Sequence, residues 1–163
     1  MRKSTGFSLI ELLVVVVIAG ILATIAGASI AGQIQQQNLS LAQQEVAQAI
    51  RNARQLALSK SRFFTIEFLV TPQNQLRIYE GTDWNTAVLK QEQTLPNNIN
   101  MQTSGSAKTT FNFRGELPPP LRTVYLVMDT DKTSYSNNDA CEAAQSCKAV
   151  VISTILGKIR TVK

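Results

Sequence analysis

The sequence contains no histidine, and it has only two cysteines and five prolines among its 163 residues. Without histidine the chain can form neither a Ser-His-Asp triad nor a Cys-His pair. Two cysteines without histidine cannot supply the four ligands of a structural zinc site. The eight glycines form neither a phosphate-binding loop nor a dinucleotide-binding fingerprint. The sequence therefore predicts a protein that is not an enzyme and that needs no cofactor or metal.

Three aspartates, Asp129, Asp131 and Asp139, lie in a polar, turn-rich stretch that extends from residue 129 to residue 146. Their spacing lacks the order of an EF-hand loop and its final glutamate. This pattern favours a solvated surface loop over a calcium site.

A long apolar run occupies the N-terminus. Arg2 and Lys3 precede it, and from Leu12 to Ile30 it contains no charged residue. This length is close to the ~20 residues that a membrane-spanning helix needs. The positive charge on its N-terminal side predicts a cytoplasmic N-terminus. Glu11 is unexpected in such a segment, because burial of a carboxylate in lipid costs about 2.5–3.5 kcal/mol.

Three interpretations of this segment compete. A cleaved secretory signal has an apolar core of about 7–15 residues and a small-residue cleavage site, whereas this run is longer and ends in no clear site. A plain signal anchor fits the hydrophobicity but leaves Glu11 unexplained. The third interpretation is a class III signal, in which a short leader is removed and the apolar helix is retained.

The third interpretation accounts for every unusual feature. The basic leader, Gly6, Phe7, Glu11 and the apolar run together resemble the cleavage and methylation site of type IV pilins and pseudopilins. The resemblance implies that residues 1–6 are a leader, that a prepilin peptidase cuts between Gly6 and Phe7, and that the new N-terminal Phe7 is methylated. It also implies a role for Glu11 in assembly.

A physical reason supports that role of Glu11. Cleavage creates an α-amine at Phe7, which is mostly cationic at neutral pH because such amines have a pKa of roughly 7.7–8.0. A carboxylate and an ammonium group that pair in a medium of low dielectric constant offset each other's burial. The resemblance implies that this pair forms between neighbouring subunits, so that Glu11 sets their register by pairing with Phe7.

The helical pattern continues beyond the apolar run, and no proline occurs before Pro72. From residue 33 to residue 60, apolar residues recur at intervals of three and four, which is typical of an amphipathic helix. Glutamines, among them Gln43, and arginines fill the other faces. We expect one helix from about Phe7 to Lys60, transmembrane over residues 7–32 and amphipathic over residues 33–60. The apolar stripe consists of Leu39, Ala42, Val46, Ala49, Ile50, Ala53, Leu56 and Ala57.

Residues 61–163 have the pattern of strands and turns and are predicted to form one β-rich globular domain. The region 81–107 resembles nothing that can be assigned. The fold class is therefore α+β and pilin-like, with the long N-terminal helix packed on an antiparallel sheet. The predicted strands are residues 63–70, 76–79, 109–113, 124–128, 148–154 and 157–162.

Cys141 and Cys147 lie six positions apart in the polar stretch. This spacing permits a small disulfide loop, which an oxidising periplasm or exterior would form. The alternative is a pair of free thiols.

Two downstream segments resemble the GspH/FimT group of minor pilins and pseudopilins. One is the stretch from Thr110 to Leu117, and the other is Gly157-Lys158-Ile159-Arg160 with the strand before it. Lys158 stands where that group usually has an arginine, which keeps the charge but loses the planar fork that binds phosphate through two bonds.

The resemblance implies a structural subunit in one of two machines. The first is a type IV pilus, where the chain would act in priming or at the tip and in DNA uptake. The second is a type II secretion system, where it would be an H-type minor pseudopilin. In both cases the chain is a single-pass inner-membrane protein with a periplasmic domain, and its partners are the other minor subunits and an inner-membrane assembly platform. A membrane-anchored binding domain that never polymerises is the remaining alternative.

The C-terminal end of the chain is basic. The formal net charge of +5 becomes +3 once Arg2 and Lys3 are removed, and no acidic residue follows Glu142. Alternation along a strand predicts Lys158 and Arg160 on one face, with Ile159 toward the core. One interpretation is a weak DNA-binding patch with a Kd of about 10⁻⁴–10⁻⁶ M, and the other is a solvated strand face that keeps the domain soluble. The patch would comprise Lys148, Lys158, Arg160 and Lys163.

Overall fold

The computed structural model describes residues 8–70, 74–82, 87–96, 98–118, 123–131, 133–152 and 158–162, apart from the side chains at 24–30. The chain divides into two compact units, Met1–Gln35 and Gln36–Lys163. Gly6, Phe7 and Lys163, which the sequence marks as site residues, lie outside the described residues.

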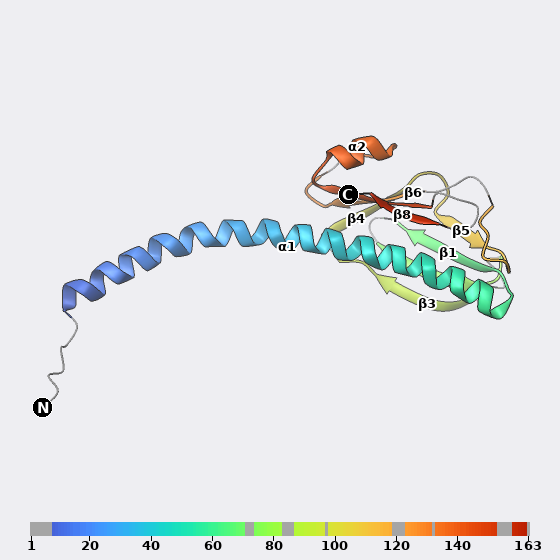
Figure 1. Cartoon of the computed structure of the whole chain (residues 1–163), viewed down its shortest axis with the longest axis horizontal. Coiled ribbons are helices and arrows are strands. Elements are labelled where there is room, and N and C mark those ends of the chain that lie inside the picture. The colour runs from blue at the N-terminus through green and yellow to red at the C-terminus, as the bar shows by residue number, and fades with distance from the viewer. Residues whose placement is uncertain are drawn as a thin grey trace, which may run out of the picture. The chain divides into compact units, whose positions relative to one another are not determined.

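A single helix, α1, extends from Leu9 to Lys60 (Figure 1). The predicted continuous helix is therefore confirmed over its described length. The helix ends at Ser61, a non-glycine residue with a φ of 51°. The backbone N–H of Arg62 donates to the carbonyl of Ala57 at 3.3 Å, which closes the last turn in the manner of a Schellman cap.

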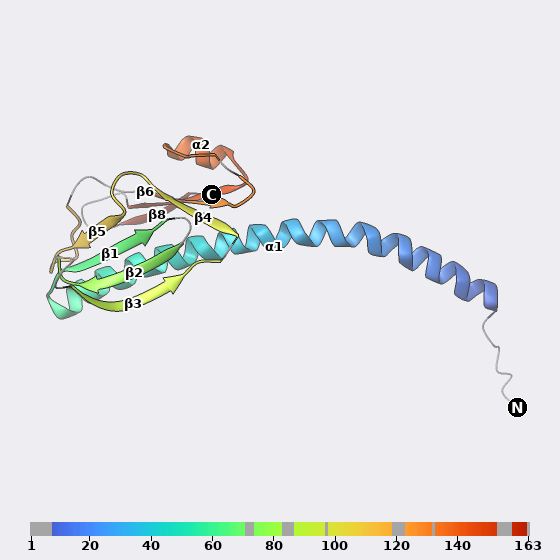
Figure 2. The ribbon, with the colours of Figure 1, turned by 180° about the vertical axis from the view of Figure 1, so that it is seen from behind.

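The strands of the described residues form two antiparallel sheets of four strands each (Figures 1 and 2). Sheet A has the order β3-β2-β1-β5, with β1 at Phe64–Leu69, β2 at Gln75–Glu80, β3 at Val88–Thr94 and β5 at Lys108–Phe111. Sheet B has the order β4-β6-β7-β8, with β4 at Ile99–Thr103, β6 at Thr123–Met128, β7 at Cys147–Ile152 and β8 at Ile159–Val162.

The sequence predicts the pilin-like α+β class correctly but not the number of sheets. All six predicted strands are present, with ends that shift by one or two residues within the described parts of the chain. Strands β3 and β4 were not predicted, and they lie in the region 81–107. A short helix, α2, at Asn138–Ala143 interrupts the stretch that was predicted to be a loop.

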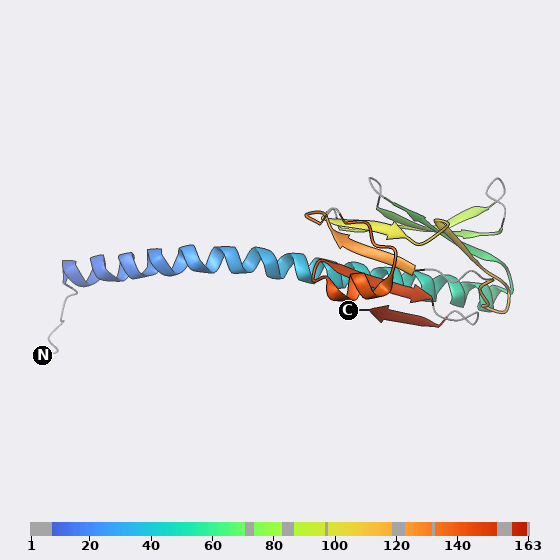
Figure 3. The same cartoon turned by 90° about the horizontal axis from the view of Figure 1, so that it is seen from above.

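The main hydrophobic core lies where the second half of α1 meets both sheets. Figure 3 shows this part of α1, from residue 36 onward, beside the strands. The predicted apolar stripe of α1 is buried here against alternate residues of the strands, among them Phe64, Ile66, Leu126 and Val150. Because both core clusters found among the described residues lie within residues 36–163, this unit has a core of its own.

One residue of the polar face is an exception. Gln43 is buried, and its amide nitrogen donates to the carbonyls of Ala149 at 3.0 Å and Val162 at 2.7 Å. Gln43 lies outside the predicted apolar stripe, and its burial was not predicted. Its side chain ties α1 to the last two strands of sheet B, because a buried amide must find partners.

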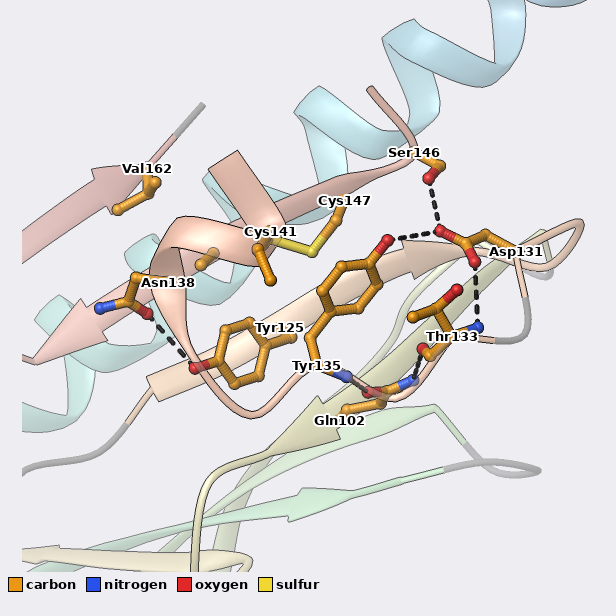
Figure 4. Close-up of a disulfide and its surroundings, with 12 residues drawn as sticks. Gln102, Tyr125, Asp131, Thr133, Tyr135, Asn138, Cys141, Ser146, Cys147 and Val162 are labelled. Atoms are coloured by element: carbon orange, nitrogen blue, oxygen red, sulfur yellow. Dashed lines mark hydrogen bonds between the residues drawn. A yellow bond between two sulfur atoms is a disulfide. The ribbon is translucent and has the colours of Figure 1, made fainter. Parts of the chain in front are cut away.

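A second, smaller hydrophobic cluster covers the other face of sheet B (Figure 4). Strand alternation separates the two clusters: Leu126 and Val150 face α1, whereas Tyr125 and Ala149 face the smaller cluster. Residues from α2 and from the segment before it complete this cluster. Its members are Tyr125, Val127, Tyr135, Cys141, Cys147, Ala149 and Val162.

Candidate assembly and binding sites

Glu11 lies in the first turn of α1, where its side chain contacts the backbone three residues earlier in the chain. The backbone N–H of Ser8 donates to Glu11 Oε2 at 3.3 Å, while the carbonyl of Ser8 accepts from Leu12 N–H at 3.2 Å. Ser8 and Glu11 thus have the S-x-x-E spacing of a capping box, in which the glutamate satisfies a free backbone donor. This contact was not predicted, although the Ser-x-x-Glu spacing alone indicates it.

The side chains described in the first part of α1 are almost all apolar and exposed. From Leu9 to Leu22, the large hydrophobic residues are each at least 47% exposed. An apolar surface that surrounds a helix on all sides requires lipid or other helices to cover it. Within the residues that the structure describes, no helix reaches the length and apolarity of a membrane span. The assignment of residues 7–32 to the membrane stays a prediction.

Cys141 and Cys147 form a disulfide, as one of the two interpretations of their spacing predicts. The bond joins α2 to the start of β7, and both cysteines are buried beside the ring of Tyr135 (Figure 4). Helix α2 begins at the cap Asn137, whose side chain accepts from the N–H of Ala140 at 2.8 Å. The disulfide and the cap hold a short helix in place that local sequence preference would not stabilise alone.

Asp131 fixes the segment that leads to α2 (Figure 4). Its carboxylate accepts from the hydroxyl of Ser146, from the hydroxyl of Tyr135 at 2.7 Å and from the N–H of Thr133 at 2.9 Å. These bonds, with that from Ser146 foremost, hold the pKa of the Asp131 carboxyl well below its usual range. The hydrogen bond that Tyr135 donates to the Asp131 carboxylate raises the pKa of the Tyr135 hydroxyl.

Gln102 connects this segment to β4. Its Oε1 accepts from the N–H of Tyr135 at 3.0 Å, and its Nε2 donates to the carbonyl of Thr133 at 3.0 Å. The three aspartates of the polar stretch have different surroundings. Asp131 has a structural role, because its carboxylate holds the segment before α2 in place. Asp139 is exposed on α2, and Asp129 Oδ1 accepts from the amide nitrogen of Asn100 at 2.9 Å. No cluster of potential metal ligands occurs among the described residues.

The basic residues of the C-terminal end do not share one face. Lys148 is half-buried on the face of β7 toward α1, and its Nζ lies 2.7 Å from Ser40 Oγ of α1. Arg160 is exposed and is paired across the ladder with Val151, on the face of sheet B that carries the disulfide. The structure therefore separates Lys148 from Arg160, and the predicted four-residue patch is not continuous.

The core contact predicted for Ile159 is confirmed. Ile159 is paired with Ile152 and packs against the main core. Lys158, just before β8, is exposed. Of the predicted patch, Lys158 and Arg160 remain the exposed basic residues of the described C-terminal end that can face a ligand together.

Comparison with known proteins identifies a sequence motif and a fold. Residues 1–27 match the family model of the prokaryotic N-terminal methylation motif. The matched residues include the first part of α1, and the second part of this helix packs on two antiparallel sheets. The chain thus has the methylation motif and the fold that its resemblance to type IV pilins and pseudopilins implies. No curated protein matches the sequence.

Two solved structures with this fold are a minor pilin and a minor pseudopilin. The type IV minor pilin FimU of Pseudomonas aeruginosa is 20% identical, with a TM-score of 0.58 over 76% of this chain and 87% of that chain. The minor pseudopilin EpsH from the Type 2 Secretion System of Vibrio cholerae is 12% identical, with a TM-score of 0.57 over 76% of this chain and 95% of that chain. At these identities the likeness shows the fold.

Proposed function

We propose that the chain is a minor subunit of a type IV filament machine, made as a precursor and then built into the filament. The observation that carries this proposal is the methylation motif at residues 1–27, which includes the start of α1, where exposed apolar side chains require lipid or other helices to cover them. A prepilin peptidase removes residues 1–6 and methylates Phe7. The role is structural and not catalytic, since the chain has no histidine and no recognised catalytic motif.

In this proposal the precursor is a single-pass protein of the bacterial inner membrane, with its N-terminus in the cytoplasm and residues 36–163 in the periplasm. The basic leader supports this orientation, and the disulfide suits an oxidising compartment. An assembly platform in the inner membrane then moves the subunit into the filament together with other minor subunits.

A type IV pilus is the first candidate machine, with a role in priming or at the tip. An H-type pseudopilin of a type II secretion system is the second, because the fold is equally similar to a pseudopilin. The neighbouring genes distinguish the two: pilus and competence genes support the first, and a secretin gene with exported proteins supports the second.

The test of the proposal is the N-terminus of the mature protein. Mass spectrometry of the membrane-extracted chain should show a methylated Phe7 as the first residue. Gly6→Leu should leave the leader attached, whereas the control Gly20→Leu should be processed normally, because a Cβ atom at Gly20 would meet nothing within 4 Å. A normal mature terminus from Gly6→Leu would contradict the proposal. A processed chain that never co-purifies with other filament subunits would instead support a non-polymerising binding domain.

A further inference from the structure

One surface of residues 36–163 combines exposed aromatic rings with basic side chains. It lies where α1 ends, β1 begins and the turn after β5 passes by, and we call it the end surface. The rings of Phe63 and Phe113 meet edge to face with centroids 6.1 Å apart, although these rings are 42% and 46% exposed. Leu58, which is 47% exposed, contacts the same turn at Gly115. The members of the end surface are Leu58, Lys60, Arg62, Phe63, Phe113 and Arg114.

The turn that presents Phe113 and Arg114 is rigid. Asn112 Oδ1 accepts from the N–H groups of Arg114 and Glu116, both at 2.9 Å, and Asn112 Nδ2 donates to Glu116 Oε2 at 2.8 Å. The carbonyl of Gly115 accepts from Arg54 Nε at 3.2 Å, which fastens the turn to α1. An exposed phenylalanine in a fixed turn loses little conformational freedom when a partner binds it.

An apolar hollow adjoins these rings. Its volume is about 510 Å³, and Phe63, Thr110, Leu117 and Pro118 line it together with Thr82, Asn112 and Glu116. A hollow of this size beside exposed rings can receive one or two large apolar side chains of a partner. Such a centre with a charged rim has the usual anatomy of a protein interface.

The rim of the end surface is basic. Arg62 bonds to Glu80 at 2.6 Å, and Lys90 also bonds to Glu80 at 3.0 Å, so one carboxylate faces two cations. The guanidinium of Arg114 lies 5.4 Å from the centroid of Phe113, and Lys60 Nζ lies 5.8 Å from that of Phe64. Glu116 accepts from the amide of Asn112 and keeps its charge, so two carboxylates, Glu80 and Glu116, stand against four cations here: Lys60, Arg62, Lys90 and Arg114. The positive excess of the rim favours a partner with carboxylates.

We propose that the end surface docks an acidic segment with a large apolar side chain that belongs to a different subunit of the same filament machine. The apolar side chain enters the hollow between Phe63 and Leu117, and carboxylates beside it face Arg114 and Lys60. This inference rests on the proposed function, since a filament subunit must contact its neighbours. Neither the fold comparison nor the methylation motif assigns this surface.

Two other occupants fit less well. A nucleic acid would need open ring faces for its bases to stack on, but Arg114 covers one face of Phe113 and the two rings meet edge to face. The acidic helix α2 of a second copy of this chain fits poorly, because its exposed residues beside Asp139 and Glu142 are alanines. These alanines are too small to fill the hollow.

The test uses the full-length chain in its native membrane with a photo-cross-linking amino acid in place of Phe63. Val70 is the matched control position, because it is also an exposed apolar residue, 41% exposed, at the opposite end of β1. Irradiation should cross-link position 63, but not position 70, to another filament subunit. Mass spectrometry should place the link in a segment with a large apolar residue next to Asp or Glu. Arg114→Glu should reduce this adduct by roughly tenfold, as expected for the loss of one interface anchor.

Several outcomes would overturn the inference. These are equal adducts from positions 63 and 70, an adduct with a second copy of the chain, a nuclease-sensitive adduct, and an adduct that Arg114→Glu does not reduce. The N-terminus and the co-purified subunits are measured on the same membranes. If Phe7 is methylated and other subunits co-purify while position 63 gives no specific adduct, the docking surface is wrong and the proposed function stands. If processing and co-purification also fail, both are wrong.

Discussion

Leu58 and Gly115 approach each other so closely that a Cβ atom on Gly115 would overlap the side chain of Leu58. A Cβ atom on Gly115 would lie 2.9 Å from Leu58 Cγ, and the backbone φ of Gly115 is +69°, a conformation that other residues rarely adopt. Two independent reasons, space and backbone conformation, thus require glycine in this turn. The segment around Gly115, which the sequence marks by its resemblance to minor pilins, therefore has a structural explanation in its glycine.

We predict that Gly115→Ala destabilises residues 36–163 by roughly 2 kcal/mol or more, because backbone strain and steric overlap add. Thermal or denaturant unfolding of this unit measures the effect. The double variant Leu58→Ala, Gly115→Ala relieves the overlap and should retain only the backbone cost of roughly 1–2 kcal/mol relative to Leu58→Ala. An equal cost in both backgrounds would contradict the steric part of the explanation.

The sequence predicted those elements whose pattern is local. The stripe of α1 and the runs of β-forming residues in β1 and β6 are visible in the residues themselves, and the structure confirms these elements. The strand β3 has no such pattern, because it is an edge strand of sheet A whose side chains are nearly all exposed. Its place depends on pairing with β2, which the local sequence does not encode.

Other features depend on contacts between distant residues. Helix α2 has only six residues and depends on the disulfide and on its cap Asn137. The burial of Gln43 and the contact of Lys148 with Ser40 require knowledge of which face of sheet B packs on α1. Alternation along β7 places Lys148 and Ala149 on opposite faces, but it does not say which face is solvated.

Asp131 should make the folded domain less stable as the pH falls into the acid range. Because its pKa is lowered on folding, its contribution is complete above the unfolded value of about 3.9 and is lost as the pH falls below that value. Asp131→Asn should lower the melting temperature of residues 36–163 at pH 7, and this difference should shrink on acidification. Tyr135→Phe removes one of the donors and should give an intermediate result. A difference between wild type and Asp131→Asn that is constant from pH 7 to acid would contradict the role of the carboxylate.

Glu11 has two candidate roles that two substitutions can separate. Glu11→Gln keeps an oxygen that can accept the N–H of Ser8 and loses the charge, whereas Glu11→Ala loses both. If Glu11 pairs with the amine of Phe7 in a neighbouring subunit, both variants should be inserted and processed but should enter filaments poorly. Co-purification with other filament subunits measures this. Normal incorporation of Glu11→Gln with poor incorporation of Glu11→Ala would show that only the helix cap matters.

The exposed basic residues at the C-terminal end allow a direct test of DNA binding. If Lys158 and Arg160 contact DNA phosphates, residues 36–163 should bind duplex DNA without sequence preference, with a Kd of about 10⁻⁴–10⁻⁶ M that weakens from 50 to 200 mM salt. The double variant Lys158→Ala, Arg160→Ala should abolish the binding. Lys148→Ala is the matched control, because Lys148 is held against Ser40 on the other face of β7 and should not contribute. If the double variant and Lys148→Ala lose DNA affinity to the same extent, the binding reflects the overall charge of the domain and not a site at Lys158 and Arg160. If the wild-type domain does not bind even at low salt, these residues only keep the strand solvated, and the secretion pseudopilin becomes the better candidate.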